Sequence, residues 1–142
     1  MKAKSVFGIA LLALCGLFIT ACDDDDNGID NITDYEANLS AADSVVTTAT
    51  GSFVASYDDD SNELTYTLTW NGMDATAAHL HNEDNPNEIV PLNVTSASNS
   101  PVEGTITLTD EQEDLLENEK YYVNVHSAEY PDGEISGELN ED

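Results

Sequence analysis

Arginine is absent from this 142-residue chain, and its three lysines stand against 29 acidic residues, for a formal net charge of −26. Lys2 and Lys4 lie at the extreme N-terminus, so Lys120 is the only base in the remainder of the chain. Phosphate groups are bound chiefly by Lys and Arg, and a strongly negative surface repels polyanions. We therefore exclude nucleic acid as a partner and expect a surface that attracts divalent cations.

Cysteine is almost as rare, and the two that are present, Cys15 and Cys22, lie near the start of the chain. Cys15 belongs to an uncharged apolar run over 6–19, which is short for a membrane-spanning helix and typical of a signal peptide. The run ends in the letters ITAC, which resemble a bacterial lipobox. This resemblance implies that 1–21 is a lipoprotein signal peptide and that Cys22 is lipidated; the alternative is a plain secretory peptide that happens to contain a cysteine.

Lipidation at Cys22 would anchor the protein to a membrane without a spanning helix. The segment 22–31, which contains the letters DDDDNGIDN, reads as an acidic tether to a single domain at 32–142. From residue 22 onward the chain has one positive charge against 29 negative charges, or −28 net. Its one cysteine, Cys22, would carry the lipid, which leaves none for a disulfide. We expect a bacterial cell-envelope protein at the outer membrane or cell surface. In some bacteria an Asp at this place retains a lipoprotein at the inner membrane, and that alternative stays open.

Alternation of apolar and polar residues predicts β-strands across 32–142. The clearest strand is 63–70, in which Leu64, Tyr66, Leu68 and Trp70 face one way and threonines face the other. Further strands are predicted at 35–40, 51–57, 77–81, 89–94, 102–108, 120–126 and 134–139. Short antiparallel strands separated by turn signals favour an all-β Greek-key sandwich or barrel, of immunoglobulin-like or superoxide-dismutase-like form.

One segment departs from the strand pattern. Thr109 is followed three residues later by Gln112, which is the spacing of a capping box, and acidic residues fill the first turn after Thr109. These signals predict one short helix near 110–118. Leu115 and Leu116 would pack inward.

Two stretches, TAAHLH at 76–81 and GTITLTDEQEDLLENEKYYVNVHSAEYPDGEISGEL at 104–139, resemble the CHRD domain, a module named for chordin that also occurs singly in bacterial exported proteins. The resemblance covers roughly 32–139. It implies an immunoglobulin-like or β-barrel fold, and most bacterial members have no assigned activity. The chain departs from the family at Ser136, where an Arg is usual, and at 44–47, which lacks the usual prolines.

The chain has only three histidines, His79, His81 and His126, and all lie within stretches that carry the resemblance. Residues i and i+2 of a strand project to one face, so His79 and His81 can converge on one ion. If the strand of His126 lies alongside, three imidazoles form a site suited to copper or zinc with an open fourth position. One ion could join them only if their nitrogens lie within about 8 Å of one another.

The ordinary interpretation of these histidines is that each is a polar residue at a sheet end, hydrogen-bonded to backbone. For a metal site, Asn124, Glu83 and Asp84 are the nearest candidates in sequence to orient the imidazoles. The residues therefore leave both interpretations open.

Three functions remain. We expect a non-enzymatic binding module that contacts another envelope or extracellular macromolecule. The first alternative is a copper or zinc binding module that uses the three histidines, and the two can both hold. The second alternative is a metal-dependent redox enzyme, by analogy with copper/zinc superoxide dismutase, but the absence of arginine and the charge of −28 oppose attraction of an anionic substrate.

Overall fold

The computed structural model describes residues 31–142. The predicted signal peptide, the lipidation site Cys22 and most of the acidic tether lie outside these residues. Within 31–142, the single helix is far too short and polar to cross a membrane. The elements follow one another in this order: β1(Ile32–Ala41), β2(Thr50–Asp58), β3(Glu63–Asn71), β4(Ala75–Asn82), β5(Ile89–Pro91), β6(Val102–Thr107), α1(Asp110–Glu117), β7(Tyr121–Ser127), β8(Ile135–Glu138) and β9(Asn140–Glu141).

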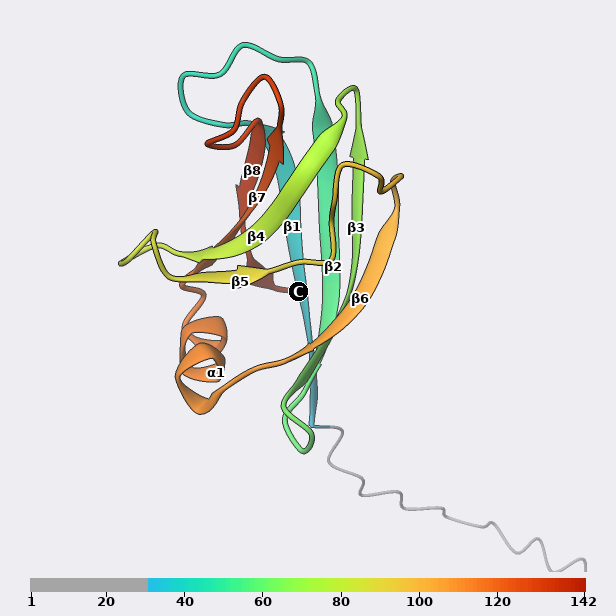
Figure 1. Ribbon diagram of the computed structural model, residues 1–142. Helices are drawn as coiled ribbons and strands as arrows, with labels where there is room; N and C mark the ends of the chain where they lie inside the picture. The colour runs from blue at the N-terminus through green and yellow to red at the C-terminus, as the bar shows by residue number, and fades with distance from the viewer. Residues whose placement is uncertain (1–30) are drawn as a thin grey trace, which may run out of the picture.

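The strands form one sheet in the order β5-β4-β7-β8-β1-β2-β3-β6, with β9 added beside β1. Every pairing is antiparallel, and the sheet curls into a half-barrel (Figure 1). The chain passes from β3, near one end of this order, to β4, near the other, and the helix-containing connection from β6 to β7 makes a second such crossing. These crossings bring β4 and β7 together although 38 residues separate the end of β4 from the start of β7.

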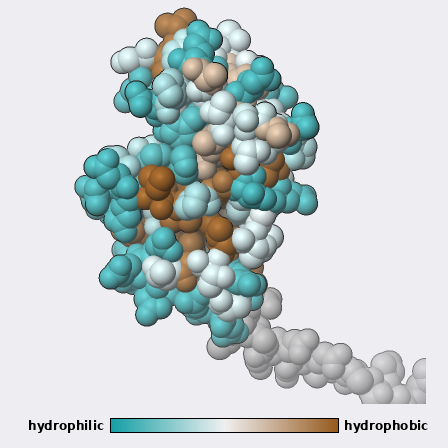
Figure 2. All heavy atoms as spheres, viewed as in Figure 1, coloured by the Kyte–Doolittle hydropathy of each residue, from teal (hydrophilic) through white to brown (hydrophobic). Residues whose placement is uncertain are grey.

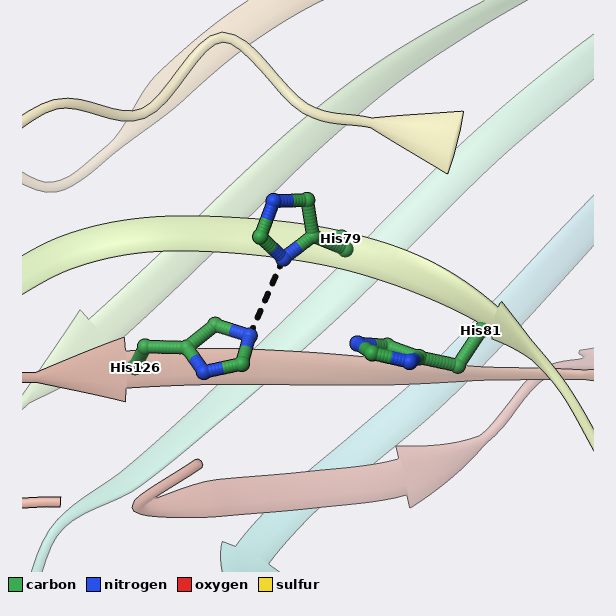
Figure 3. A group of neighbouring side chains, drawn as sticks. All are labelled: His79, His81 and His126. Atoms are coloured by element: carbon green, nitrogen blue, oxygen red, sulfur yellow. Dashed lines mark hydrogen bonds between the residues drawn. The ribbon is translucent and has the colours of Figure 1, made fainter. Parts of the chain in front are cut away.

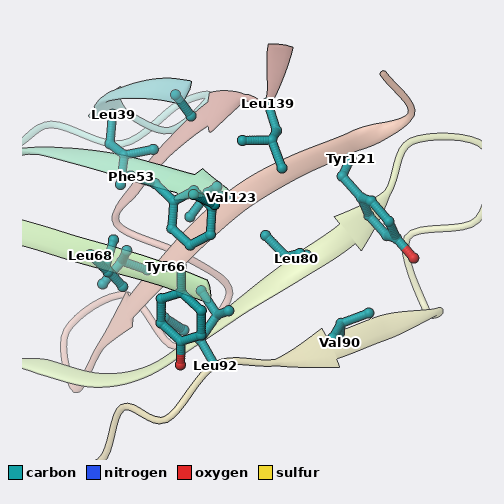
Figure 4. Close-up of a cluster of buried hydrophobic side chains, with 14 of the residues drawn as sticks. Leu39, Phe53, Tyr66, Leu68, Leu80, Val90, Leu92, Tyr121, Val123 and Leu139 are labelled. Carbon is teal, nitrogen blue, oxygen red and sulfur yellow. The ribbon is translucent and has the colours of Figure 1, made fainter. Parts of the chain in front are cut away.

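The core lies inside the curl, because one face of each long strand is apolar. Figure 4 shows side chains from β1, β2, β3, β4 and β7 directed into the same space. The rings of Phe53 and Tyr66 stack there with centroids 5.4 Å apart. Gly104 makes room for Tyr66, since a Cβ at that position would lie 2.5 Å from the tyrosine hydroxyl. Figure 2 shows apolar atoms in the middle of one face, surrounded by a mainly hydrophilic surface.

The all-β prediction and the short helix are confirmed. Leu64, Tyr66, Leu68 and Trp70 are all buried, as the alternation in 63–70 predicts. The capping box at the start of α1 is present in both directions, with Thr109 and Gln112 each accepting a hydrogen bond from the other's backbone N–H. Of the two helix leucines, Leu116 is fully buried and Leu115 packs partly against the core.

The structure corrects two strand boundaries. The strand expected at 89–94 ends at Pro91, although the N–H of Leu92 still donates to the carbonyl of Ala78 on β4 at 2.9 Å. The chain then turns, with the N–H of Val94 donating to the carbonyl of Leu92 at 2.8 Å. The strand expected at 134–139 is β8, which spans Ile135–Glu138; Leu139 is buried in the core and donates to the carbonyl of Tyr121, and β9 follows as a separate short strand beside β1.

Candidate metal centre

The three histidines lie on the outer face of two paired strands, β4 and β7. In the register of this pair, His79 stands opposite Asn124, His81 opposite Tyr122, and His126 opposite Ala77. His126 is therefore the diagonal neighbour of His79, within reach of its side chain. The alternate residues of both strands, such as Leu80 and Val125, are completely buried on the core side. The hydrophobic core thus holds the backbone of both strands directly beneath the imidazoles.

The imidazoles converge, as Figure 3 shows. His79 Nδ1 lies 3.0 Å from His126 Nε2, and one nitrogen from each ring lies within 4.8 Å of the others. His79 and His126 meet nearly edge to face, with ring centroids 4.9 Å apart at 70°. This proximity meets the condition set by the sequence, since every separation is well below about 8 Å. In residues 31–142, no other group of histidine or acidic side chains comes together in this way.

Backbone carbonyls fix which nitrogen of two rings carries the proton. His126 Nδ1 lies 2.9 Å from the carbonyl oxygen of Pro131, and His81 Nδ1 lies 2.9 Å from that of Pro86. A carbonyl can only accept, so each Nδ1 is the donor. The Nε2 lone pairs of His81 and His126 are consequently available to the centre of the cluster. His79 Nδ1 donates to His126 Nε2, which is the remaining acceptor of that pair.

His81 Nε2 is the unusual atom of the cluster. It is buried, and it has no hydrogen-bond partner in the described part of the chain. Buried polar atoms are normally paired, because an unmade hydrogen bond costs about 1–3 kcal/mol. Since the tautomer makes this nitrogen an acceptor, only a proton donor or a metal ion can satisfy it. The ordinary interpretation, in which each histidine is satisfied by backbone, therefore accounts for His81 Nδ1 and leaves Nε2 unexplained.

Burial favours the neutral form of His79 and His126. It lowers the pKa of His79 below its usual value of 6.5, and the neighbouring His126 and His81 lower it further. Burial also lowers the pKa of His126, although the hydrogen bond to the Pro131 carbonyl partly opposes this effect. His126 is only 8% exposed. Neutral imidazole is the form that binds metals, so the site is ready for an ion at neutral pH.

The residues expected to orient the imidazoles are not the ones that do so. Asp84 pairs instead with Lys120, with 3.7 Å between its Oδ2 and Nζ, and the amide of Asn124 donates to the carbonyl of Asp132. Glu83 forms a backbone hydrogen bond to Lys120 and none to a histidine ring. The orienting groups are the backbone carbonyls of Pro86 and Pro131, and the sequence does not reveal which carbonyls are used. Prolines are frequent in turns, and that was the only available signal.

Tyr122 adds an aromatic wall to the cluster. Its ring stacks on His81 with centroids 5.1 Å apart at 15°. Tyr122 and His126 are four residues apart on β7 and therefore lie on the same face of the strand. Burial raises the pKa of Tyr122, with a further contribution from the charge of Glu83. The phenol is therefore neutral at physiological pH and supports the imidazole by packing.

Comparison with known proteins places the chain in a family. Residues 35–139 match the family model described as the CHRD domain. No match was found among curated proteins or among solved structures. The match covers β1 to β8 and includes all three histidines. The chain therefore belongs to the CHRD domain family.

Proposed function

We propose that this protein is a non-enzymatic CHRD binding module of the bacterial cell envelope, lipid-anchored through Cys22, whose three histidines bind one copper or zinc ion. CHRD membership suggests a binding or interaction module. The observation that carries the metal assignment is the buried, unpartnered His81 Nε2 beside two other neutral imidazoles. His79 Nδ1, His81 Nε2 and His126 Nε2 would be the ligand atoms, and the proton of His79 would move from Nδ1 to Nε2 when the ion binds.

The cluster fits such an ion after a small adjustment. Nitrogens bound to one tetrahedral ion at 2.0–2.1 Å lie about 3.4 Å apart. The present limit of 4.8 Å means that the most distant pair must draw together by at most about 1.4 Å, which side-chain rotation can supply. The hydrogen bond between His79 and His126 would be exchanged for two metal bonds. The carbonyl of Pro86 would keep its hydrogen bond to Nδ1 of His81, and the carbonyl of Pro131 would keep its hydrogen bond to Nδ1 of His126. Outer partners of metal-bound histidines commonly hold the rings in this way.

The three neutral nitrogen ligands favour copper over zinc, because divalent copper stands highest in the Irving–Williams order. They leave a fourth position for water or for a group from a partner. The chain after Cys22 contains no cysteine, so it offers no thiolate to compete for either metal once Cys22 is modified.

Metal titration tests this proposal. The protein used is the chain from residue 22 onward with Cys22→Ser, which cannot be lipidated; we call it the lipid-free protein. Calorimetry with Cu²⁺ and Zn²⁺ should show one ion per chain, with copper bound more tightly. His79→Ala, His81→Ala and His126→Ala should each weaken binding by more than about 100-fold, beyond the loss expected for an outer partner.

A matched control separates the histidine site from loose attraction to the acidic surface. Asp59→Asn with Asp60→Asn removes two exposed carboxylates from the β2–β3 turn and should leave stoichiometric binding unchanged. Absence of stoichiometric copper or zinc binding by the lipid-free protein with all three histidines present would refute the metal assignment. The binding-module role is tested separately, by retention of envelope proteins on the immobilised lipid-free protein. Retention no greater than that of the acidic tether alone would contradict it.

A further inference from the structure

A second binding feature lies beside the histidines on the same outer face. It is an open groove of about 930 Å³, which we call the acidic groove. Its walls come from the end of β1, the segment 42–45, strands β7 and β8, and the turn at 129–133. Tyr122 and Asn124 belong to its lining, and the register sets them opposite Glu138 and Ser136 of β8. The volume is within the usual range for sites that bind small molecules.

The groove is strongly negative. Five carboxylates line it, and no lining residue is basic: Asp43, Glu83, Glu129, Asp132 and Glu138. Lys120 is the sole base in residues 31–142, and it pairs with Asp84 outside the lining. The carboxylates do not converge as a metal site, because in the described residues only the histidines form such a group. Their spread suits a ligand that carries its positive charge along its length.

The side chain of Asn124 supports the same class of ligand by an argument that does not use charge. Its side chain is 6% exposed and lines the groove. Its Nδ2 donates to the carbonyl of Asp132 at 3.0 Å, whereas its Oδ1 is buried and has no partner among the described residues. An amide oxygen can only accept, so the missing partner is a donor.

Two tyrosines complete the lining. Tyr122 is held in place by its stacking on His81, and Tyr130 is held by a hydrogen bond from its hydroxyl to the carbonyl of Val46. Aromatic faces attract cations, with the greatest effect for organic cations that shed their water easily. The groove therefore combines charge, an unmet acceptor and aromatic walls.

We propose that the acidic groove binds an organic ammonium ligand, either a free linear polyamine or the lysine side chains of a basic peptide. This goes beyond the metal function, because no ammonium-binding group of the groove is a histidine. Calorimetry of the metal-free, lipid-free protein at physiological salt supplies the test, with spermine as the free polyamine and tetralysine as the peptide. The presence of a chelator keeps the result independent of the metal site.

The critical comparison uses two variants of equal charge. Glu129→Gln, Asp132→Asn and Glu138→Gln together remove three of the five groove carboxylates, and Asp59→Asn, Asp60→Asn and Glu63→Gln together remove three from the β2–β3 turn and the start of β3; all six side chains are exposed. The groove variant should weaken binding by about 10-fold or more, and the turn variant by less than about 2-fold, because screening confines each charge to its neighbourhood. Tyr122→Leu should also weaken binding.

Each outcome decides the proposal. Tighter binding of spermine than of tetralysine would identify a free amine as the ligand, and the reverse order would identify a basic peptide. Equal losses in the two charge variants would show diffuse attraction to an acidic surface and overturn the proposal. Absence of binding by both probes would also overturn it, whatever the metal titration shows.

Discussion

His79 Nδ1 lies 3.0 Å from His126 Nε2, although 47 residues separate the two histidines in the chain. The contact exists because β4 and β7 are neighbours in the sheet and His126 stands diagonal to His79 in their register. Both rings are neutral in this arrangement, since a proton on both would set two positive charges against each other. This contact governs how the protein should respond to pH and to metal.

The stability of the metal-free protein should depend on these two histidines. Burial lowers the pKa of His79 and of His126 in the folded protein, whereas both titrate near 6.5 in the unfolded chain. As pH falls below about 6.5, these two histidines bind more protons in the unfolded chain than in the folded protein. Their contribution to the free energy of unfolding is therefore full above that pH and is lost below it. Urea unfolding from pH 5 to 8 measures it.

A suitable control is the double variant His79→Gln with His126→Gln. Protonation of the many carboxylates affects both proteins alike, so the difference between their free energies of unfolding isolates the histidines. As pH falls from 7 to 5, the free energy of unfolding of the wild type should decrease relative to that of the double variant. A pH-independent difference would contradict the lowered pKa values.

Copper should stabilise the folded protein. An ion that binds only the folded state adds about 2.7 kcal/mol at 100 times its Kd. For a domain of this size, that corresponds to a rise in Tm of about 10 °C. Differential scanning calorimetry of the lipid-free protein with and without Cu²⁺ measures the change. His81→Ala should abolish the rise; an equal rise in this variant would place the ion elsewhere.

Gly133→Ala should destabilise the protein severely. Gly133 has φ of +128°, which L-residues rarely adopt, and a Cβ there would lie 2.1 Å from Asn124 Oδ1. We expect a loss of more than about 2 kcal/mol in the free energy of unfolding, measured in urea. Gly72→Ala is the comparison, because φ is +83° but the nearest atom is 3.3 Å away. A smaller loss at Gly133 than at Gly72 would show that the Asn124 contact relaxes freely.

Lipidation should depend on Cys22. Replacement by serine should move the protein from the membrane fraction to the soluble fraction and abolish labelling by a fatty-acid analogue, because one residue carries the whole anchor. Cys15→Ser is the matched control, since that cysteine lies within the predicted signal peptide. Labelling that survives in Cys22→Ser would refute the lipobox interpretation.

Much of the fold was predictable because strand faces and helix caps are local patterns. Phe53 and Tyr57 alternate with polar neighbours on β2, and both are buried as that period requires. Thr109 caps α1 through residues only three positions away. The limits of β5 were wrong, since the apolar pattern continues to Val94 while the chain turns away from β4 after Leu92.

The site was predictable in its residues and unpredictable in its chemistry. The sequence named His79, His81 and His126, but the groups that orient the rings are the carbonyls of Pro86 and Pro131. Every residue has a carbonyl, so composition carries no signal for the one that is used. The binding of a metal stays a prediction.

The sequence by itself determined the class of fold, the CHRD family, the negative charge and the placement of His79 and His81 on one strand face. The family follows from the resemblance of the stretches at 76–81 and 104–139. The fold class, the charge and the histidine placement follow from residue type and a period of two, which act over a few neighbouring positions. Only the tertiary structure decided that β7 lies beside β4, that His81 Nε2 is left without a partner, and that an acidic groove adjoins the histidines. The reason is that pairing between distant strands is chosen by burial of the whole core, which no short segment encodes.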